Sequence, residues 1–246
     1  MNLASRILRT NDRVRLRGRL INDDSVPRLV PLWADPSGRI APVEPMAVDL
    51  LGWDGTLPRA SASVVGTWDG AAVVVAQLES SPDGESEFRF SPLLGEQVDL
   101  DLPILDTMST TADTGRRDEV VRELIDRGSA LHHAQVRAGN ATAHVVSAVD
   151  AAAVEAALRP LLQETLVVVP SPWTRADLDA VQQILSDEEN SAGLFMSGEG
   201  LDPRGLYRAS GWVRQITPRL AERLEPYPGG IVALDSWLKP THAVAW

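Results

Sequence analysis

The chain of 246 residues contains no cysteine, and Lys239 is its only lysine. The lack of thiols excludes disulfides, thiolate zinc sites and cysteine nucleophiles, and a single lysine leaves little scope for Schiff-base or phosphate-loop chemistry. No apolar run approaches the roughly 18 residues that a membrane-spanning helix needs. The first ten residues, Met1 to Thr10, lack the apolar core of a secretory signal peptide. These absences predict a cytoplasmic protein with no cofactor, no metal site and no membrane association.

Acidic residues outnumber basic ones by 34 to 23, which gives a formal net charge of -11 at pH 7. The hydrophobic content of 44% and the charged content of 23% are typical of a folded globular protein. Because nucleic acids and anionic membranes are themselves negative, this charge argues against binding either with the whole surface. A local basic patch stays compatible with it, and the overall balance favours a basic partner.

The strongest periodic pattern lies in residues 141–190. Residues 141–147 alternate as a strand does, and Asp150 can cap a helix whose apolar positions follow the spacing i, i+3, i+4. A β-branched run over residues 165–169 suits a buried strand, and Thr174 begins a capping box for a second helix. Strand, helix, strand and helix at this spacing predict a parallel pair of strands with a right-handed crossover.

Shorter strand patterns fill the first part of the chain. Arg13–Ile21 alternates arginine with apolar residues or glycine, residues 60–78 read as a hairpin with Asp69-Gly70 at its tip, and residues 86–90 form a further short strand. This rhythm predicts a small barrel or sandwich. With Trp68 before the tip, the hairpin and the arginine strand resemble the oligonucleotide- or oligosaccharide-binding (OB) barrels. That resemblance implies a ligand groove with basic and aromatic side chains.

The fold class that follows is α+β, with a mainly-β N-terminal half and a C-terminal half that contains the βαβα unit. We expect a mainly-β domain over residues 1–104, a linker of small polar residues over 105–116 and an α/β domain over 117–246. The helix after Asp150 should end or kink at Pro160, because proline lacks the N–H of the helical hydrogen bond. No internal repeat is visible in the sequence.

Three further segments of the C-terminal half carry expectations. A helix is predicted over residues 117–127, with Gly128 at its end. The glycine-rich residues 197–205 are predicted to form a loop. Thr217-Pro218 should begin another helix with proline at its first position.

The main functional hypothesis is a non-catalytic acidic protein that contacts a basic protein partner, as an immunity-like or chaperone-like protein would. It rests on the net charge, on the missing catalytic motifs and on acidic stretches such as residues 83–87. The candidate contact residues are Asp187, Glu188, Glu189 and Glu199. The oligomeric state stays open.

An alternative hypothesis is a single-stranded nucleic-acid-binding module. Strand alternation would place Arg13, Arg15, Arg17 and Arg19 on one face, where guanidinium groups can bind phosphates, with Trp33 and Trp68 as stacking surfaces. The competing interpretation is a solvated sheet face whose arginines pair with carboxylates on neighbouring strands. For the two tryptophans, the competing interpretation is that they pack in the core.

A third hypothesis is a hydrolase that uses a histidine with a carboxylate. The candidates are His132, His133 and His144. Adjacent residues of a strand face opposite ways, so His132 and His133 should point apart. The hypothesis requires the imidazoles to converge in one cleft.

Overall fold

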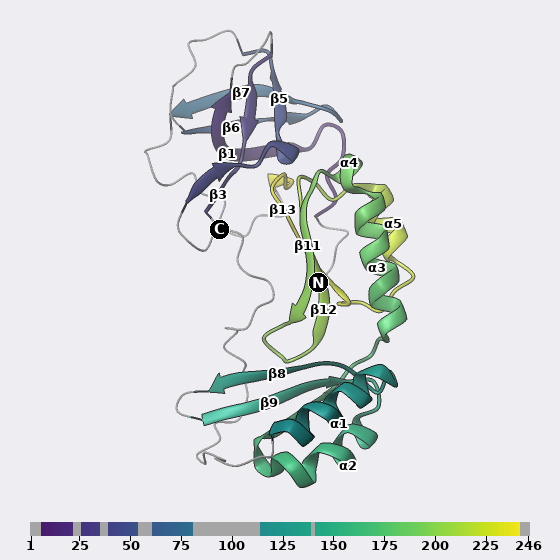
Figure 1. Ribbon diagram of the computed structural model, residues 1–246. Coiled ribbons are helices and arrows are strands. Elements are labelled where there is room, and N and C mark those ends of the chain that lie inside the picture. The colour runs from purple at the N-terminus through teal and green to yellow at the C-terminus, as the bar shows by residue number, and fades with distance from the viewer. Residues whose placement is uncertain are drawn as a thin grey trace.

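The computed structural model describes residues 6–21, 26–34, 39–53, 61–80, 114–138 and 141–241. Three bodies follow one another along the molecule (Figure 1). A β-barrel lies at one end, a sheet covered by α3 and α5 lies in the middle, and a sheet covered by α1 and α2 lies at the other end. The predicted α+β class, with a mainly-β N-terminal half, is confirmed.

The barrel is closed and has the strand order β1-β2-β5-β7-β6. All its neighbouring strands run antiparallel except β5 and β7, which are parallel. A separate hairpin of β3 and β4 and a short 3-10 turn, η2, are inserted between β2 and β5. The bounds are β1 (Arg13–Ile21), β2 (Arg28–Val30), β3 (Leu32–Ala34), β4 (Ile40–Pro42), η2 (Glu44–Met46), β5 (Val48–Leu51), β6 (Ser61–Trp68) and β7 (Val73–Ser80).

Strand β1 closes the barrel because its side chains alternate and one of its inward positions is glycine. Val14, Leu16 and Gly18 are buried between exposed arginines. A Cβ atom on Gly18 would lie 2.4 Å from the carbonyl oxygen of Val30 on β2, closer than real contacts allow. The missing side chain therefore lets β1 pair with β6 and β2 on its two edges at this point.

The rest of the described chain is two units with the same topology, helix–strand–strand–helix–strand. In each, the two strands after the first helix form an antiparallel hairpin, and the last strand runs parallel to the second strand of that hairpin. The first unit consists of α1 (Thr114–Asp126), β8 (Ala130–Ala138), β9 (Ala141–Ala148), α2 (Ala151–Leu162), η3 (Gln163–Thr165) and β10 (Leu166–Pro170). The second unit consists of α3 (Arg175–Asp187), α4 (Glu189–Ala192), β11 (Leu194–Leu201), β12 (Tyr207–Val213), α5 (Pro218–Leu224) and β13 (Val232–Ser236). The structure thus contains a topological repeat that the sequence analysis missed.

The helices α2, α3 and α5 begin at the capping residues that the sequence predicts. The Asp150 carboxylate accepts the N–H of Ala153, and Thr174 forms a full capping box with Asp177. The Thr217 hydroxyl accepts from the N–H of Leu220 at the start of α5. The parallel pairing of β9 with β10 is confirmed as well.

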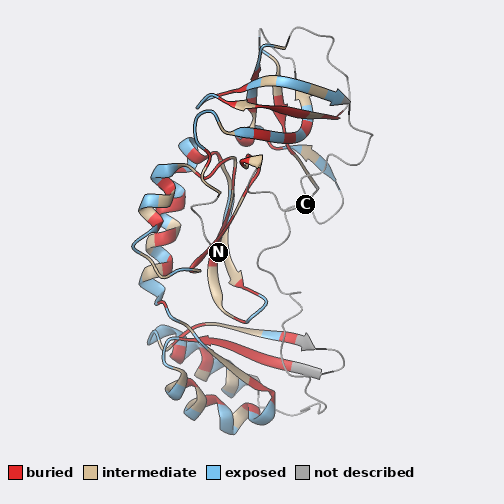
Figure 2. Ribbon diagram, turned by 180° about the vertical axis from the view of Figure 1, so that it is seen from behind, coloured by how far each residue is buried: buried red, intermediate tan, exposed pale blue. Residues whose placement is uncertain are grey.

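Each unit buries the apolar faces of its helices against its sheet. In the first unit Val121 and Leu124 of α1 and Leu158 of α2 pack on Val146 of β9. Figure 2 shows β9 buried along its described length, between the helices and the second unit. In the second unit the largest cluster joins α3, α5, β12 and β13, with members such as Leu178, Leu185, Leu220 and Leu234.

Two tryptophans connect the three bodies. Trp173, just after β10, is 3% exposed, and its indole N–H donates to the carbonyl of Tyr207 on β12 at 2.7 Å. Trp237, just after β13, is 6% exposed and donates to the carbonyl of Arg17 on β1 at 3.1 Å. The last strand of each unit is thus followed by an indole that docks on the neighbouring body.

Three local expectations differ from the structure. Helix α2 continues past Pro160 to Leu162, because a proline in the last turn removes only one helical hydrogen bond. Residues 197–201, expected in a loop, belong to β11, because they pair in register with β12 from Ser197↔Gly211 to Leu201↔Tyr207. Helix α1 begins at Thr114, three residues before the expected start.

Several expectations fall outside the described residues. These are the strand over residues 86–90, the acidic stretch 83–87 and most of the linker 105–116. The division into domains 1–104 and 117–246 stays a prediction. Ile7 pairs with Ile216 of the second unit, so the N-terminal segment crosses from that unit into the barrel.

Candidate functional site

The most strongly charged surface row of the barrel is the outer face of β1. Arg13, Arg15, Arg17 and Arg19 are all exposed, as the alternation predicts. Alternate residues of a strand are about 6.7 Å apart, so the row extends over about 20 Å. We call these four residues the arginine row.

The strand beside the arginine row carries small side chains. Thr67, Val65, Ser63 and Ser61 of β6 lie directly opposite the four arginines, in that order. Paired residues of antiparallel strands face the same side of the sheet. The arginines therefore share this face with side chains that are shorter than they are. Beyond β6, Gln77 and Glu79 of β7 lie opposite Val65 and Ser63, which places one carboxylate two strands from the row. In the described part of the chain, Arg13, Arg17 and Arg19 form no ion pair.

The two predicted stacking residues lie elsewhere. Trp68 is 3% exposed inside the barrel core, so its ring presents no face to a ligand. Trp33 is half-buried and packs edge-on against Phe195 of β11, with ring centroids 5.7 Å apart at 66°. Neither Trp33 nor Trp68 therefore lies beside the arginine row as a stacking platform.

The predicted acidic contact residues are mostly bound within the chain. The side chain of Glu188 is 2% exposed and meets Arg219 at 2.8 Å, Arg223 at 3.1 Å and the Ser191 hydroxyl at 2.5 Å. Burial raises the pKa of Glu188, but the hydrogen bonds from Ser191 and Arg223 and the charge of Arg219 outweigh it and lower that pKa overall.

The other members of the acidic set divide between paired and exposed positions. Asp187 pairs with Arg223 at 2.7 Å, and this hydrogen bond lowers its pKa. Glu189 begins α4 and is exposed. Their role as contacts for a basic partner stays a prediction.

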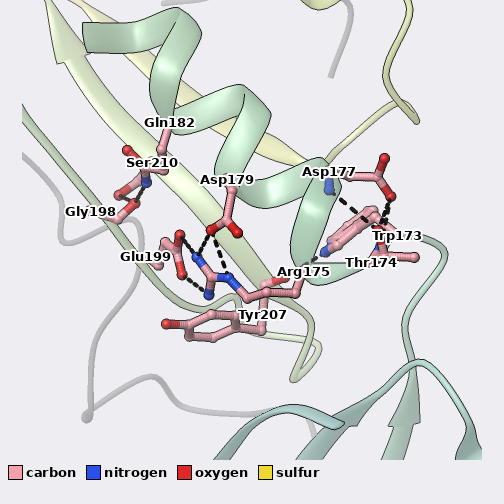
Figure 3. A network of polar contacts seen from close by, with 10 residues as sticks. All are labelled: Trp173, Thr174, Arg175, Asp177, Asp179, Gln182, Gly198, Glu199, Tyr207 and Ser210. Carbon is pink, nitrogen blue, oxygen red and sulfur yellow. Dashed lines mark hydrogen bonds and ion pairs between the residues drawn. The ribbon is translucent and has the colours of Figure 1, made fainter. Parts of the chain in front are cut away.

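Glu199 belongs to a polar network at the start of α3. Its two carboxylate oxygens accept from Arg175 at 2.7 and 2.5 Å, and Arg175 also donates to Asp179 at 2.8 Å. Figure 3 shows the guanidinium between the two carboxylates, with the Tyr207 ring alongside. The hydrogen bond that Arg175 donates to Glu199 raises the pKa of Arg175. Burial, followed by the charge of Glu199, raises the pKa of Tyr207. The arrangement is a closed ion-pair network that ties α3 to β11.

The three candidate histidines lie on both faces of the first unit's sheet. His132 stacks on Tyr207, with ring centroids 4.4 Å apart at 11°, on the face toward the second unit. On the face toward α1, His133 and His144 share a hydrogen bond of 3.0 Å between Nε2 and Nδ1. The sheet therefore separates His132 from the other two, and the three do not converge in one cleft. The His133–His144 contact was not predicted, although strand alternation could have placed both residues on one face.

Burial explains the acid–base state of these imidazoles. It lowers the pKa of His133 to about 4, with further lowering by His144 and Arg117. Burial also lowers the pKa of His144 and of His132. All three are therefore neutral at pH 7.

No protein-family model, curated protein or solved structure matches this chain. Within the described ranges, no group of three or more histidine, aspartate or glutamate residues is placed to hold a metal ion. Nor is any helix of those ranges both long and apolar enough to cross a membrane.

Proposed function

We propose that this chain is a non-catalytic binding protein whose barrel holds an anionic polymer, and that single-stranded nucleic acid is the class of ligand it fits. The observation that carries the proposal is the arginine row, four guanidinium groups exposed on one face of a strand. Guanidinium groups bind phosphate oxygens with paired N–H donors, and a basic track along a sheet follows a phosphate backbone.

The topology of the barrel supports the same proposal. Its order β1-β2-β5-β7-β6, with β5 and β7 as the one parallel pair, is the arrangement of the five-stranded barrels of the OB type. Barrels of that type bind oligonucleotides and oligosaccharides through the face of their second and third strands, here β2 and β5, and through adjoining loops. The arginine row meets that face at Arg19, which pairs with Val30 of β2. Ser63 and Thr67, two partly exposed residues beside the arginines, add hydroxyl donors for phosphate oxygens.

The decisive experiment is a fluorescence anisotropy titration of a labelled oligothymidine, longer than the site of about 4 to 16 nucleotides that one such barrel covers. If each arginine contacts one phosphate, log K should fall with log salt with a slope of about -3, since each contact to a single strand contributes about -0.7. Absence of binding at low salt would overturn the proposal.

A matched pair of variants distinguishes the effect of the arginine row on binding from the effect of the overall charge. The first replaces Arg13, Arg15, Arg17 and Arg19 by glutamine. The second replaces four other exposed arginines by glutamine and so removes the same charge: Arg9, Arg122, Arg127 and Arg204. The first should lose at least about tenfold in affinity and most of the salt slope, and the second should keep both. Equal losses in the two variants would assign the effect to net charge alone.

The alternative of a basic protein partner is supported by the composition. The net charge is -11, and residues 81–113 contain eight carboxylates and one arginine, Arg89. A polycation such as polylysine tests it, because an electrostatic complex should weaken steeply as salt is added. A complex that is indifferent to salt would count against this alternative. The hydrolase hypothesis stays a prediction that no contact described above supports.

A further inference from the structure

In the two topologically equivalent units, one pair of neighbouring positions carries histidine in the first unit and other residues in the second. Each parallel ladder has five pairs. The first begins with His144 opposite Leu166, and the second begins with Ala209 opposite Val232. Two residues further along β9 and β12, His133 pairs with Val146 and Ser197 pairs with Gly211. The first unit therefore has two imidazoles where the second has a methyl group and a hydroxymethyl group.

These imidazoles form one hydrogen-bonded pair on the face of the sheet toward α1, in which His144 is buried and His133 is half-buried. His144 is 7% exposed, and its ring and that of His133 are parallel within 4°. Their hydrogen bond of 3.0 Å requires one ring nitrogen to donate and the other to accept. At least one of the two rings must therefore be neutral for the contact to survive.

The charged surroundings oppose protonation of the pair. The charge of Arg117 on α1 disfavours a positive charge on either histidine, whereas the charge of Asp118 on α1 favours one. His132 is the neighbouring titratable group on β8. The carboxylate of Asp118 is already paired with Arg117 at 2.7 Å. The α2 residues that pack on this sheet, Val154 and Leu158 among them, are apolar and can neutralise no charge.

We propose that the His133–His144 pair is an acid-sensitive device that holds α1 on the β8–β9 hairpin in neutral solution and releases it in mildly acidic solution, while the second unit stays closed. A first proton can be shared along the hydrogen bond only at the cost of a buried cation beside Arg117. A second proton removes the accepting nitrogen and places two adjacent imidazolium groups in the repulsive field of Arg117. The first turn of α1 carries Arg117, so repulsion acts directly on that helix.

Hydrogen exchange of the full chain tests the device, because the second unit serves as an internal control. Exchange rates, corrected for the intrinsic effect of pH, should be compared at pH 7.5 and pH 5. In α1 and the β8–β9 hairpin they should rise at least about tenfold in acid, and in α3 and the β11–β12 hairpin they should change by less than about twofold. An equal rise in both units would overturn the proposal.

Two variants assign the effect to the histidines. A double variant, His133→Ser with His144→Ala, installs the residues of the second unit and should abolish the acid response. His132→Gln, on the opposite face, should leave the response as it is. An unchanged response in the double variant would overturn the proposal.

Should the double variant fail to fold, the wild-type chain still decides the matter by NMR titration. Both imidazoles of the pair should titrate below the ordinary histidine value of about 6.5. A pKa at or above this ordinary value for either ring would show that the pair accepts protons without cost. That result would also overturn the proposal.

Discussion

The indole N–H of Trp237 donates to the backbone carbonyl of Arg17, a residue 220 positions earlier in the chain. The same indole packs into the barrel core, together with Leu238. The segment after β13 therefore completes the barrel that the first residues of the chain begin, and the arginine row is held in place partly by the opposite end of the described chain. Since Arg17 is a member of that row, its backbone position depends on the second unit.

Replacement of Trp237 should consequently destabilise the protein and not only the second unit. Trp237→Ala removes a large buried side chain and should lower the free energy of unfolding by about 3 to 5 kcal/mol, whereas Trp237→Phe keeps most of the packing and should cost less. Urea unfolding followed by circular dichroism measures both. The control is Met196→Ala, because Met196 is 39% exposed. A loss no larger for Trp237→Ala than for that control would contradict the docking role.

Gly18 gives a second prediction, on barrel closure. Gly18→Ala should destabilise the barrel by about 1 to 3 kcal/mol, since its Cβ would press on the backbone of Val30 and the strands would have to separate. Gly229→Ala is the control, because a Cβ there meets no atom within 4 Å. Thermal unfolding of the two variants checks the difference, and equal melting temperatures would refute the steric explanation.

Local patterns in the sequence predicted much of the fold. The alternation of β1 placed all four arginines on the outer face, and Asp150 and Thr174 began their helices as caps. These features depend on neighbouring residues alone. The second part of β11, residues 197–201, was missed because Gly198 and Gly200 suggest a loop, and only the pairing with β12 makes these residues extended. The repeat was missed because equivalent positions carry unlike residues, as His144 and Ala209 do.

The candidate sites likewise differ in whether local sequence patterns predict them. The arginine row is a local pattern and could be predicted. The internal neutralisation of Glu188 could not, because its partners Arg219 and Arg223 lie more than 30 residues further along the chain and reach it only when α5 packs beside α3. The burial of Trp68 likewise follows from barrel closure and from no local signal.

The acidic run after α3 yields a prediction with a control from the neighbouring residue. Glu188→Gln should destabilise the protein by about 1 to 3 kcal/mol, because it leaves charged donors around a buried position without their anion. Glu189→Gln, at an exposed position, should stay within about 0.5 kcal/mol of wild type. Chemical denaturation at pH 7 measures both values. Similar effects at the two positions would show that Glu188 is a solvated surface carboxylate.

The stability of the protein should fall in mild acid because of the histidines in the described part of the chain. The folded pKa of His133 is about 4, below the value of about 6.5 for an unfolded histidine. Between these values the unfolded state binds more protons than the folded state, so stability rises with pH across the window and falls as the solution is acidified. His132 and His144 act in the same direction.

The perturbed carboxylates act at lower pH and can be separated from the histidines. Asp69, Asp177, Asp187 and Glu188 have lowered pKa values, so their contribution is present above the unfolded value of about 4 and is lost only as pH falls below it. Urea midpoints measured from pH 7.5 to pH 4.5 should therefore fall steadily in wild type. In His133→Gln the decline should be shallower, because one imidazole that resists protonation has been removed. A wild-type midpoint that stays constant across this range would contradict the burial of neutral imidazoles on which the argument depends.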